Sequence, residues 1–180
     1  RDVPRRQRGQ AERGRGERGK PAVAGADTLE FSFSHSRESA VIAVATSAVG
    51  VDAEHDRRAR RPVQTAQRIF HPDTAATLTA LPPHSRTAAF LAAWTQREAH
   101  VKAVGGGLFH TADALPFDPA LPADGAPRLV PDRVSGEPWS VAHFAPAAAS
   151  FACVVVRGEL HALHFHHHAT LPFDSGGKDR

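Results

Sequence analysis

The sequence predicts one α+β domain in which an antiparallel sheet packs against helices. Stretches of strand character come first along the chain, helical stretches follow them, and further strand stretches come last. The longest helical stretch, residues 86–104, runs directly into three glycines, which end a helix abruptly. A chain of 180 residues is long enough for one ordinary domain with a real core and too short for two comfortable ones.

The first strands are expected in residues 29–54. Residues 29–33 alternate apolar and polar side chains, as a half-buried strand does, and the polar segment 34–36 that follows is expected to turn. The apolar stretches 40–46 and 49–54 predict two more strands. Beyond the helices, 128–130 predicts a short strand, 139–144 and 151–156 an antiparallel pair, and 160–165 a further strand.

Helices are expected in the middle of the chain, after a basic connection at residues 57–62. Segments 63–70 and 72–81 have helical character, with Pro72 suited to a first turn and a proline pair at 82–83 ending the region. Residues 86–104 contain good helix formers and an apolar stripe, so they form the central predicted helix. Residues 110–138 are rich in proline, glycine and aspartate and are expected to be mostly loop.

The ends of the chain differ from its middle. Residues 1–18 are rich in arginine and glycine and are expected to be disordered, residues 19–170 to fold, and residues 171–180 to form a polar tail. The basic segment could bind a polyanion such as nucleic acid, but a flexible tail is the favoured interpretation. The sequence contains no apolar run of the roughly 18 residues that span a bilayer and no leader-like start, so a cytoplasmic protein without membrane contact is expected. The single cysteine, Cys153, lies in an apolar run and is expected to be a buried, inert thiol.

Two acidic residues on the third expected strand are candidates for a metal site. Asp52 and Glu54 are two positions apart, so on a strand they face the same side, and Val51 and Ala53 face the other. Adjacent carboxylates repel unless a cation or a proton joins them. Taken alone, such a pair is more often an exposed strand end with two solvated acids.

A second set of residues lies along one face of the central helix. Phe90, Trp94, Glu98 and Lys102 recur every four residues, and the first two favour burial. A lone Glu98–Lys102 pair would be a routine surface salt bridge, but charges that continue an apolar stripe are expected at a cleft. If Glu98 faces Asp52, the acids offer the oxygen ligands that Mg²⁺ prefers, and Lys102 lies one turn further on, near a phosphate.

The order of four motifs resembles the Sfp-like 4'-phosphopantetheinyl transferases. They are Gly19-Lys20-Pro21, then the segment Phe31-Ser32-Phe33-Ser34-His35-Ser36, then Gly50-Val51-Asp52-Ala53-Glu54, then Trp94-Thr95-Gln96-Arg97-Glu98-Ala99 with Lys102, Gly105 and Gly107. Each motif alone is weak or moderate, and the last is fairly specific. Together they cover residues 19 to 108.

The resemblance implies a role for each matching residue. It implies magnesium ligands at Asp52, Glu54 and Glu98, with Glu98 also a candidate base for the incoming serine. It implies coenzyme A contacts from Lys20, His35, Arg97 and Lys102, of which Lys102 would also act in catalysis. Arg97 stands where the family often has lysine, and Ser32 stands where it often has asparagine.

The resemblance also implies a reaction and partners. The enzyme would move 4'-phosphopantetheine from coenzyme A to a serine of an acyl or peptidyl carrier protein, with Mg²⁺, and release 3',5'-ADP. Members of this type usually pair two similar halves, so the second half is expected to be largely complete here and the first mostly missing. A fragment, or self-association that replaces the missing half, is expected. Two alternatives stay open, a non-catalytic remnant of the fold and an arginine-rich polyanion-binding protein.

Five histidines near the C-terminal end form a second candidate metal cluster: His161, His164, His166, His167 and His168. Histidine is a good ligand for transition metals. Dense histidine without regular spacing is more often incidental and solvated, so we expect no physiological metal site there.

Overall fold

The fold is given by a computed structural model. It describes residues 29–37, 39–56, 61–105 and 114–168, and the backbone alone of residues 13–15 and 21–23. In chain order the elements are β1 (Arg13–Arg15), β2 (Pro21–Val23), β3 (Glu30–Ser36), β4 (Ser39–Ala45), β5 (Val49–His55), α1 (Pro62–Ile69), α2 (Pro72–Ala80), α3 (Arg86–Val104), β6 (Arg128–Pro131), β7 (Pro138–Phe144) and β8 (Ser150–Arg157).

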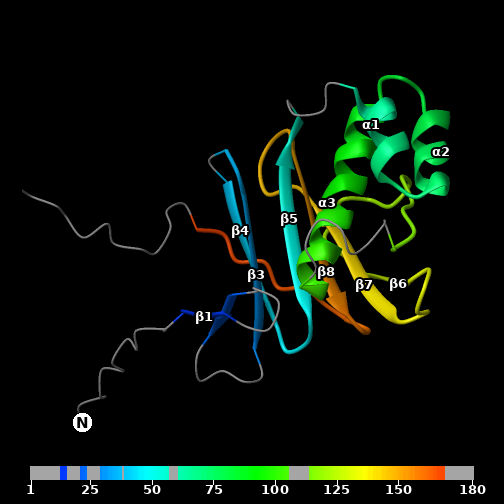
Figure 1. The fold of residues 1–180 in the computed structure, drawn as a ribbon. Coiled ribbons are helices and arrows are strands. Elements are labelled where there is room, and N and C mark those ends of the chain that lie inside the picture. The colour runs from blue at the N-terminus through cyan, green and yellow to red at the C-terminus, as the bar shows by residue number, and fades with distance from the viewer. Residues whose placement is uncertain are drawn as a thin grey trace, which may run out of the picture.

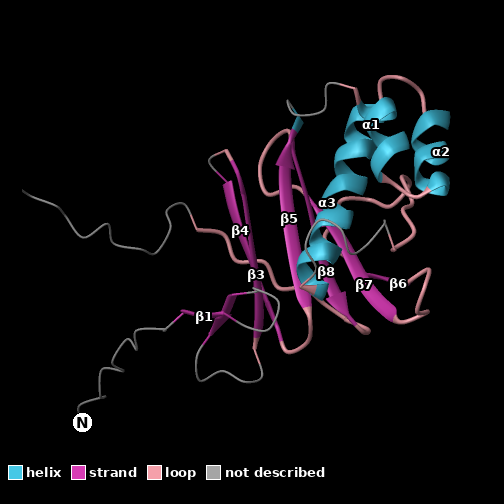
Figure 2. Cartoon of the chain, in the orientation of Figure 1, coloured by secondary structure: helices cyan, strands magenta, loops and turns pink. Residues whose placement is uncertain are grey.

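An antiparallel four-stranded sheet in the order β5-β8-β7-β6 forms the centre of the fold. Strands β3 and β4 form a separate antiparallel hairpin, and β1 pairs with β2. Figure 1 shows α3 running along one side of the four-stranded sheet, with the hairpin beside β5 and the two short helices near one end of α3. Figure 2 colours these helices and strands by type. Their order and pairing confirm the predicted α+β class with its antiparallel sheet.

Both faces of the central sheet are buried. On one face, Ala99 and Ala103 of α3 pack against Trp139, Cys153 and Val155. The other face carries a valine-rich cluster from β5, β7 and β8, and half-buried residues of β4 pack against it. Strand β5 is therefore an edge strand of the sheet and lies between α3 and the hairpin. It carries the two predicted acids, Asp52 and Glu54.

Most predicted elements are confirmed within one or two residues. Helix α3 has the bounds expected from the sequence and ends at Gly105, whose φ of 67° is a left-handed conformation that glycine adopts at low cost. The antiparallel pairing of β7 with β8 is confirmed. Cys153 is fully buried, and burial raises the pKa of its thiol well above the usual range, as expected for an inert cysteine.

Three expectations about secondary structure were wrong. Residues 34–36 do not turn, because β3 continues through Ser36 and the turn begins at Arg37. Residues 160–165 form no strand. In the segment expected to be disordered, Arg13–Arg15 forms a short strand paired with β2, while residues 1–12, 16–20 and 169–180 lie outside the described part of the chain.

Candidate functional site

The site begins with an unusually close approach between β5 and α3. A Cβ atom added at Gly50 would stand 1.8 Å from the carbonyl oxygen of Ala99 and 2.6 Å from the nitrogen of Ala103. No side chain fits in that space, so glycine lets the strand touch the helix backbone directly. Asp52 lies two residues after Gly50 on β5, so this contact places it beside the following turn of α3.

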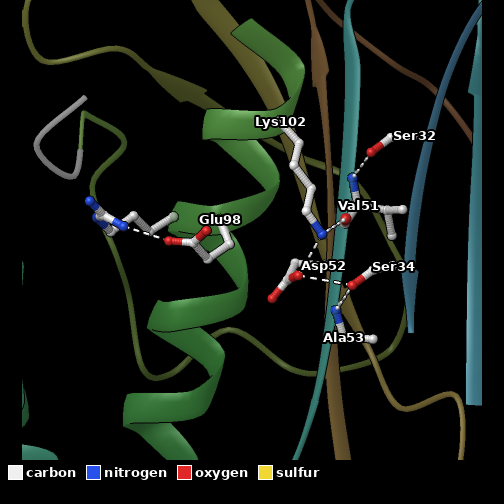
Figure 3. Close-up of polar contacts among 8 residues, drawn as sticks. Ser32, Ser34, Val51, Asp52, Ala53, Glu98 and Lys102 are labelled. Atoms are coloured by element: carbon white, nitrogen blue, oxygen red, sulfur yellow. Dashed lines mark hydrogen bonds and ion pairs between the residues drawn. The ribbon is translucent and has the colours of Figure 1, made fainter. Parts of the chain in front are cut away.

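Lys102 reaches across this contact from α3 to β5. Its Nζ donates to Asp52 Oδ1 at 2.7 Å and to the carbonyl oxygen of Val51 at 3.0 Å. Figure 3 shows the Lys102 side chain extended along α3 toward the Asp52 carboxylate. The Asp52 side chain is only 9% exposed and that of Lys102 33%, so the carboxylate is shielded from water while the ammonium group is partly open to it. The sequence predicts Glu98 opposite Asp52 and Lys102 near a phosphate, so the direct pair between Lys102 and Asp52 is a finding of the structure that the sequence did not predict.

Serine side chains of β3 complete the environment of β5. Ser32 Oγ accepts the backbone N–H of Val51 at 3.0 Å, and Ser34 Oγ accepts that of Ala53 at 3.2 Å. Ser34 Oγ also donates to Asp52 Oδ1 at 2.9 Å. Although β3 and β5 are not paired as neighbouring strands, these hydroxyls satisfy amides on the free edge of β5.

Glu98 lies on the same helix as Lys102, one turn earlier. Its carboxylate pairs with the Arg97 guanidinium, which lies 5.9 Å from the centre of the Trp94 ring. Burial raises the pKa of Glu98 above its usual range; Arg97 and Lys102 oppose this shift, and the charge of Asp52 adds to it. The negative charge of Asp52, across the contact between α3 and β5, is thus one of the causes that raise the pKa of Glu98.

Glu54, the other predicted acid of β5, is half-buried and borders a cleft of about 450 Å³. The cleft lies between the β3–β4 turn, the end of β5 and the β7–β8 turn, and Arg37 and His55 also line it. A carboxylate and two basic groups around one small cleft suit a polar or charged ligand group.

The structure does not bring every predicted residue to this place. His35 is exposed and alternates with Ser34 along β3, so it faces away from Asp52, and its ring lies 5.8 Å from that of Phe33. Its predicted contact with coenzyme A stays a prediction. Lys20 lies outside the described residues.

No ready-made metal site exists in the described part of the chain. Across residues 29–37, 39–56, 61–105 and 114–168, no three His, Cys, Asp or Glu side chains converge as metal ligands. Asp52 is paired with Lys102, and Glu98 with Arg97, so the predicted three-acid set stays a prediction. The histidines of residues 161–168 are all exposed and form no such group either.

Two residues near the site, Ser34 and Gln96, were not predicted from the sequence. For Ser34, the alternation Phe31-Ser32-Phe33-Ser34 was a visible signal that its side chain shares a strand face with Ser32. Gln96 was also missed: it is buried, donates to the carbonyl oxygens of Leu115 and Pro116, and its Oε1 lies 3.1 Å from His143 Nε2. This network fixes the loop before β6 to α3, directly beside Arg97 and Glu98.

Comparisons with known proteins match the same region. The sequence model of the 4'-phosphopantetheinyl transferase superfamily matches residues 48–156, which run from the start of β5 to β8. The chain is 32% identical over 93 residues to 4'-phosphopantetheinyl transferase gsp of Aneurinibacillus migulanus, a match that covers 52% of this chain and 38% of that protein. It is 33% identical over 127 residues to 4'-phosphopantetheinyl transferase HetI of Nostoc sp. strain PCC 7120, covering 64% of this chain and 54% of that protein. The chain thus spans roughly half or less of the length of these curated relatives.

Of the helices described, none has the length and apolar character needed to cross a membrane.

Proposed function

The chain belongs to the 4'-phosphopantetheinyl transferase superfamily, and we propose that it transfers 4'-phosphopantetheine from coenzyme A to a serine of an acyl or peptidyl carrier protein. The observation that carries this proposal is the meeting of Asp52 and Lys102 across the β5–α3 contact, with Glu98 one turn away, inside the matched region. Such a transferase is proposed to act in the cytoplasm, and the buried Cys153 thiol is consistent with a reducing compartment.

The proposed reaction is one phosphoryl-type displacement. The carrier serine oxygen attacks the β-phosphorus of coenzyme A, a P–O bond forms, and the bond from that phosphorus to the bridging oxygen breaks. The products are the phosphopantetheinyl-serine and 3',5'-ADP, and the serine proton passes to a base. Such a transfer depends on positioning and on neutralising charge more than on covalent catalysis.

We propose that Asp52, Glu98 and Glu54 hold Mg²⁺. Two observations support the fit: Asp52 Oδ2 is buried and accepts no hydrogen bond from the described part of the chain, and the charge of Asp52 helps to raise the pKa of Glu98. Carboxylate oxygens are the ligands that Mg²⁺ prefers. When bound, the ion would neutralise phosphate charge. Because Asp52 and Glu98 are each paired with a basic side chain, the ion would have to compete with Lys102 and Arg97.

The basic residues then acquire proposed roles on the substrate. Lys102, once released from Asp52, is in place to contact a phosphate of coenzyme A, and Arg97 can bind an anionic group beside it. Glu98, whose pKa is raised by burial, is suited to accept the proton of the carrier serine because its pKa is nearer neutrality. The cleft beside Glu54 offers a route by which the serine could approach.

One assay tests the proposal. The purified full chain is incubated with coenzyme A, Mg²⁺ and an apo-carrier protein, and the intact mass of the carrier is measured. We expect addition of one phosphopantetheine and its loss when Mg²⁺ is removed with a chelator. A folded chain that binds coenzyme A but adds nothing would favour the non-catalytic remnant, and a chain that binds neither would contradict the proposed substrate.

A further inference from the structure

Three serines on one face of β3 use their hydroxyl groups differently. Ser32, Ser34 and Ser36 are all buried, and all point toward β5. The hydroxyl of Ser32 accepts one backbone N–H of β5, and that of Ser34 accepts another and also donates to Asp52. The hydroxyl of Ser36 has no hydrogen-bond partner among the described residues. Within the described part of the chain, only Ser34 of the three serines forms a hydrogen bond with a functional side chain.

The hydroxyl of Ser34 has one hydrogen, which it donates in a hydrogen bond to Asp52 Oδ1. The same oxygen also accepts a hydrogen bond from Lys102 Nζ. Two donors thus converge on Oδ1, while Oδ2 is buried and has no donor among the residues that the structure describes. Figure 3 shows Ser34 and Lys102 meeting Asp52 from different elements, one from the hairpin and one from α3.

We propose that Ser34 is a positioning residue that fixes Asp52 as a one-oxygen ligand, with Oδ2 turned to the cation. The inference rests on the magnesium part of the proposed function. The terminal torsion of aspartate is broad, so the backbone alone does not decide which oxygen faces the site. A hydrogen bond to Oδ1 decides it and leaves Oδ2 for the ion.

Ser34 matters more than Lys102 for this orientation once the ion is present. In the proposed reaction the Lys102 ammonium group leaves Asp52 for a phosphate, so its bond to Oδ1 is temporary. The Ser34 hydroxyl is neutral and is held by the Ala53 N–H, so it can keep its bond to Oδ1 throughout. Mg²⁺ demands nearly ideal octahedral geometry, so a carboxylate free to rotate would bind it less well.

The test measures cation binding directly. Mn²⁺ is titrated into the full chain, and free Mn²⁺ is followed by electron paramagnetic resonance, without coenzyme A or carrier protein. Ser34→Ala is compared with Ser32→Ala, which removes an equivalent serine–backbone bond but no contact with the carboxylate. Asp52→Asn reports whether binding occurs at this site, and thermal melting verifies that each variant is folded.

We expect Ser34→Ala to weaken Mn²⁺ binding about tenfold and Ser32→Ala to change it less than twofold. In the transfer assay, Ser34→Ala should raise the Mg²⁺ concentration needed for half-maximal rate, with the rate largely restored at saturating Mg²⁺. Equal effects of the two serine variants, or no effect of Ser34→Ala, would overturn the positioning role alone. If the unchanged chain binds no Mn²⁺, or if Asp52→Asn binds it equally well, the proposed cation site itself is wrong, and the inference is wrong with it.

Discussion

Gly50 of β5 lies against the backbone of Ala99 on α3, at a distance that leaves no room for even one methyl group. The two elements that carry Asp52, Glu98 and Lys102 are therefore held at backbone contact. The distance between acid and base across the site depends on this one glycine.

Gly50→Ala should destabilise the protein and separate β5 from α3. The added Cβ would overlap backbone atoms that cannot rotate away, so we expect the free energy of unfolding to fall by about 3 kcal/mol, measured by urea denaturation. Gly136→Ala is the control: it has open space, but its φ of 71° is left-handed, so it should cost only about 1 kcal/mol. A Gly50 variant as stable as the Gly136 variant would contradict this packing.

Glu98→Gln should remove transfer and keep the fold. The change replaces a carboxylate with a neutral amide of similar size, so a proposed cation ligand and base is lost with little change in packing. We expect the rate of phosphopantetheine addition to fall at least about a hundredfold. Glu137→Gln serves as the matched control, because Glu137 is exposed and its carboxylate pairs with Arg157 at 3.5 Å, away from Asp52 and Glu98. Full activity of the Glu98 variant would show that the assigned role is wrong.

Lys102→Met should affect cation binding and transfer in opposite directions. Removing the amine leaves Asp52 without its cationic partner, so a divalent ion meets less competition, and we expect Mn²⁺ affinity to rise several-fold in calorimetry. Transfer should fall because a proposed phosphate contact is lost. Arg133→Met, which breaks the ion pair with Asp73 away from the site, should change neither property. A parallel fall in affinity and rate would mean that Lys102 helps to hold the ion.

His143 should make stability depend on pH. Burial lowers its pKa from 6.5 to about 4, so between these values the unfolded chain binds a proton that the folded chain does not. Stability is therefore complete above pH 6.5 and is lost as the pH falls toward 4, by up to roughly 3 kcal/mol. Urea denaturation from pH 7 to pH 4.5 measures this slope. In His143→Gln the slope should become shallower, although His100, whose pKa burial also lowers, should keep part of it.

Local sequence patterns predicted the features that depend on one element. The four-residue spacing of Phe90, Trp94, Glu98 and Lys102 fixes a common helix face regardless of the rest of the fold. The alternation around Asp52 likewise fixes the side of β5 on which the carboxylate lies. The structure confirms the two elements themselves, since Phe90 to Lys102 lie in α3 and Asp52 lies in β5.

Features that depend on two elements were not predictable in this way. Ser34 and Ser36 resemble turn residues because their hydroxyls are polar, but a neighbouring strand supplies the amide that makes Ser34 favourable inside β3. The need for glycine at position 50 arises only from the approach of α3. The stretch 160–165 has strand composition, yet it joins no sheet among the described residues, and Leu160 and Leu163 pack as side chains on the sheet.

Because of the serine contacts between β3 and β5, the backbone amides of β5 report on two separate opening motions, that of the hairpin and that of the central sheet. Amides alternate in direction along a strand, so those of Val51 and Ala53 face the hairpin, while those of Gly50 and Asp52 face β8. Hydrogen exchange at the first pair needs only the hairpin to detach, whereas exchange at the second needs the central sheet to open. Adjacent residues of β5 should then exchange at different rates, and their difference measures how tightly the hairpin is held.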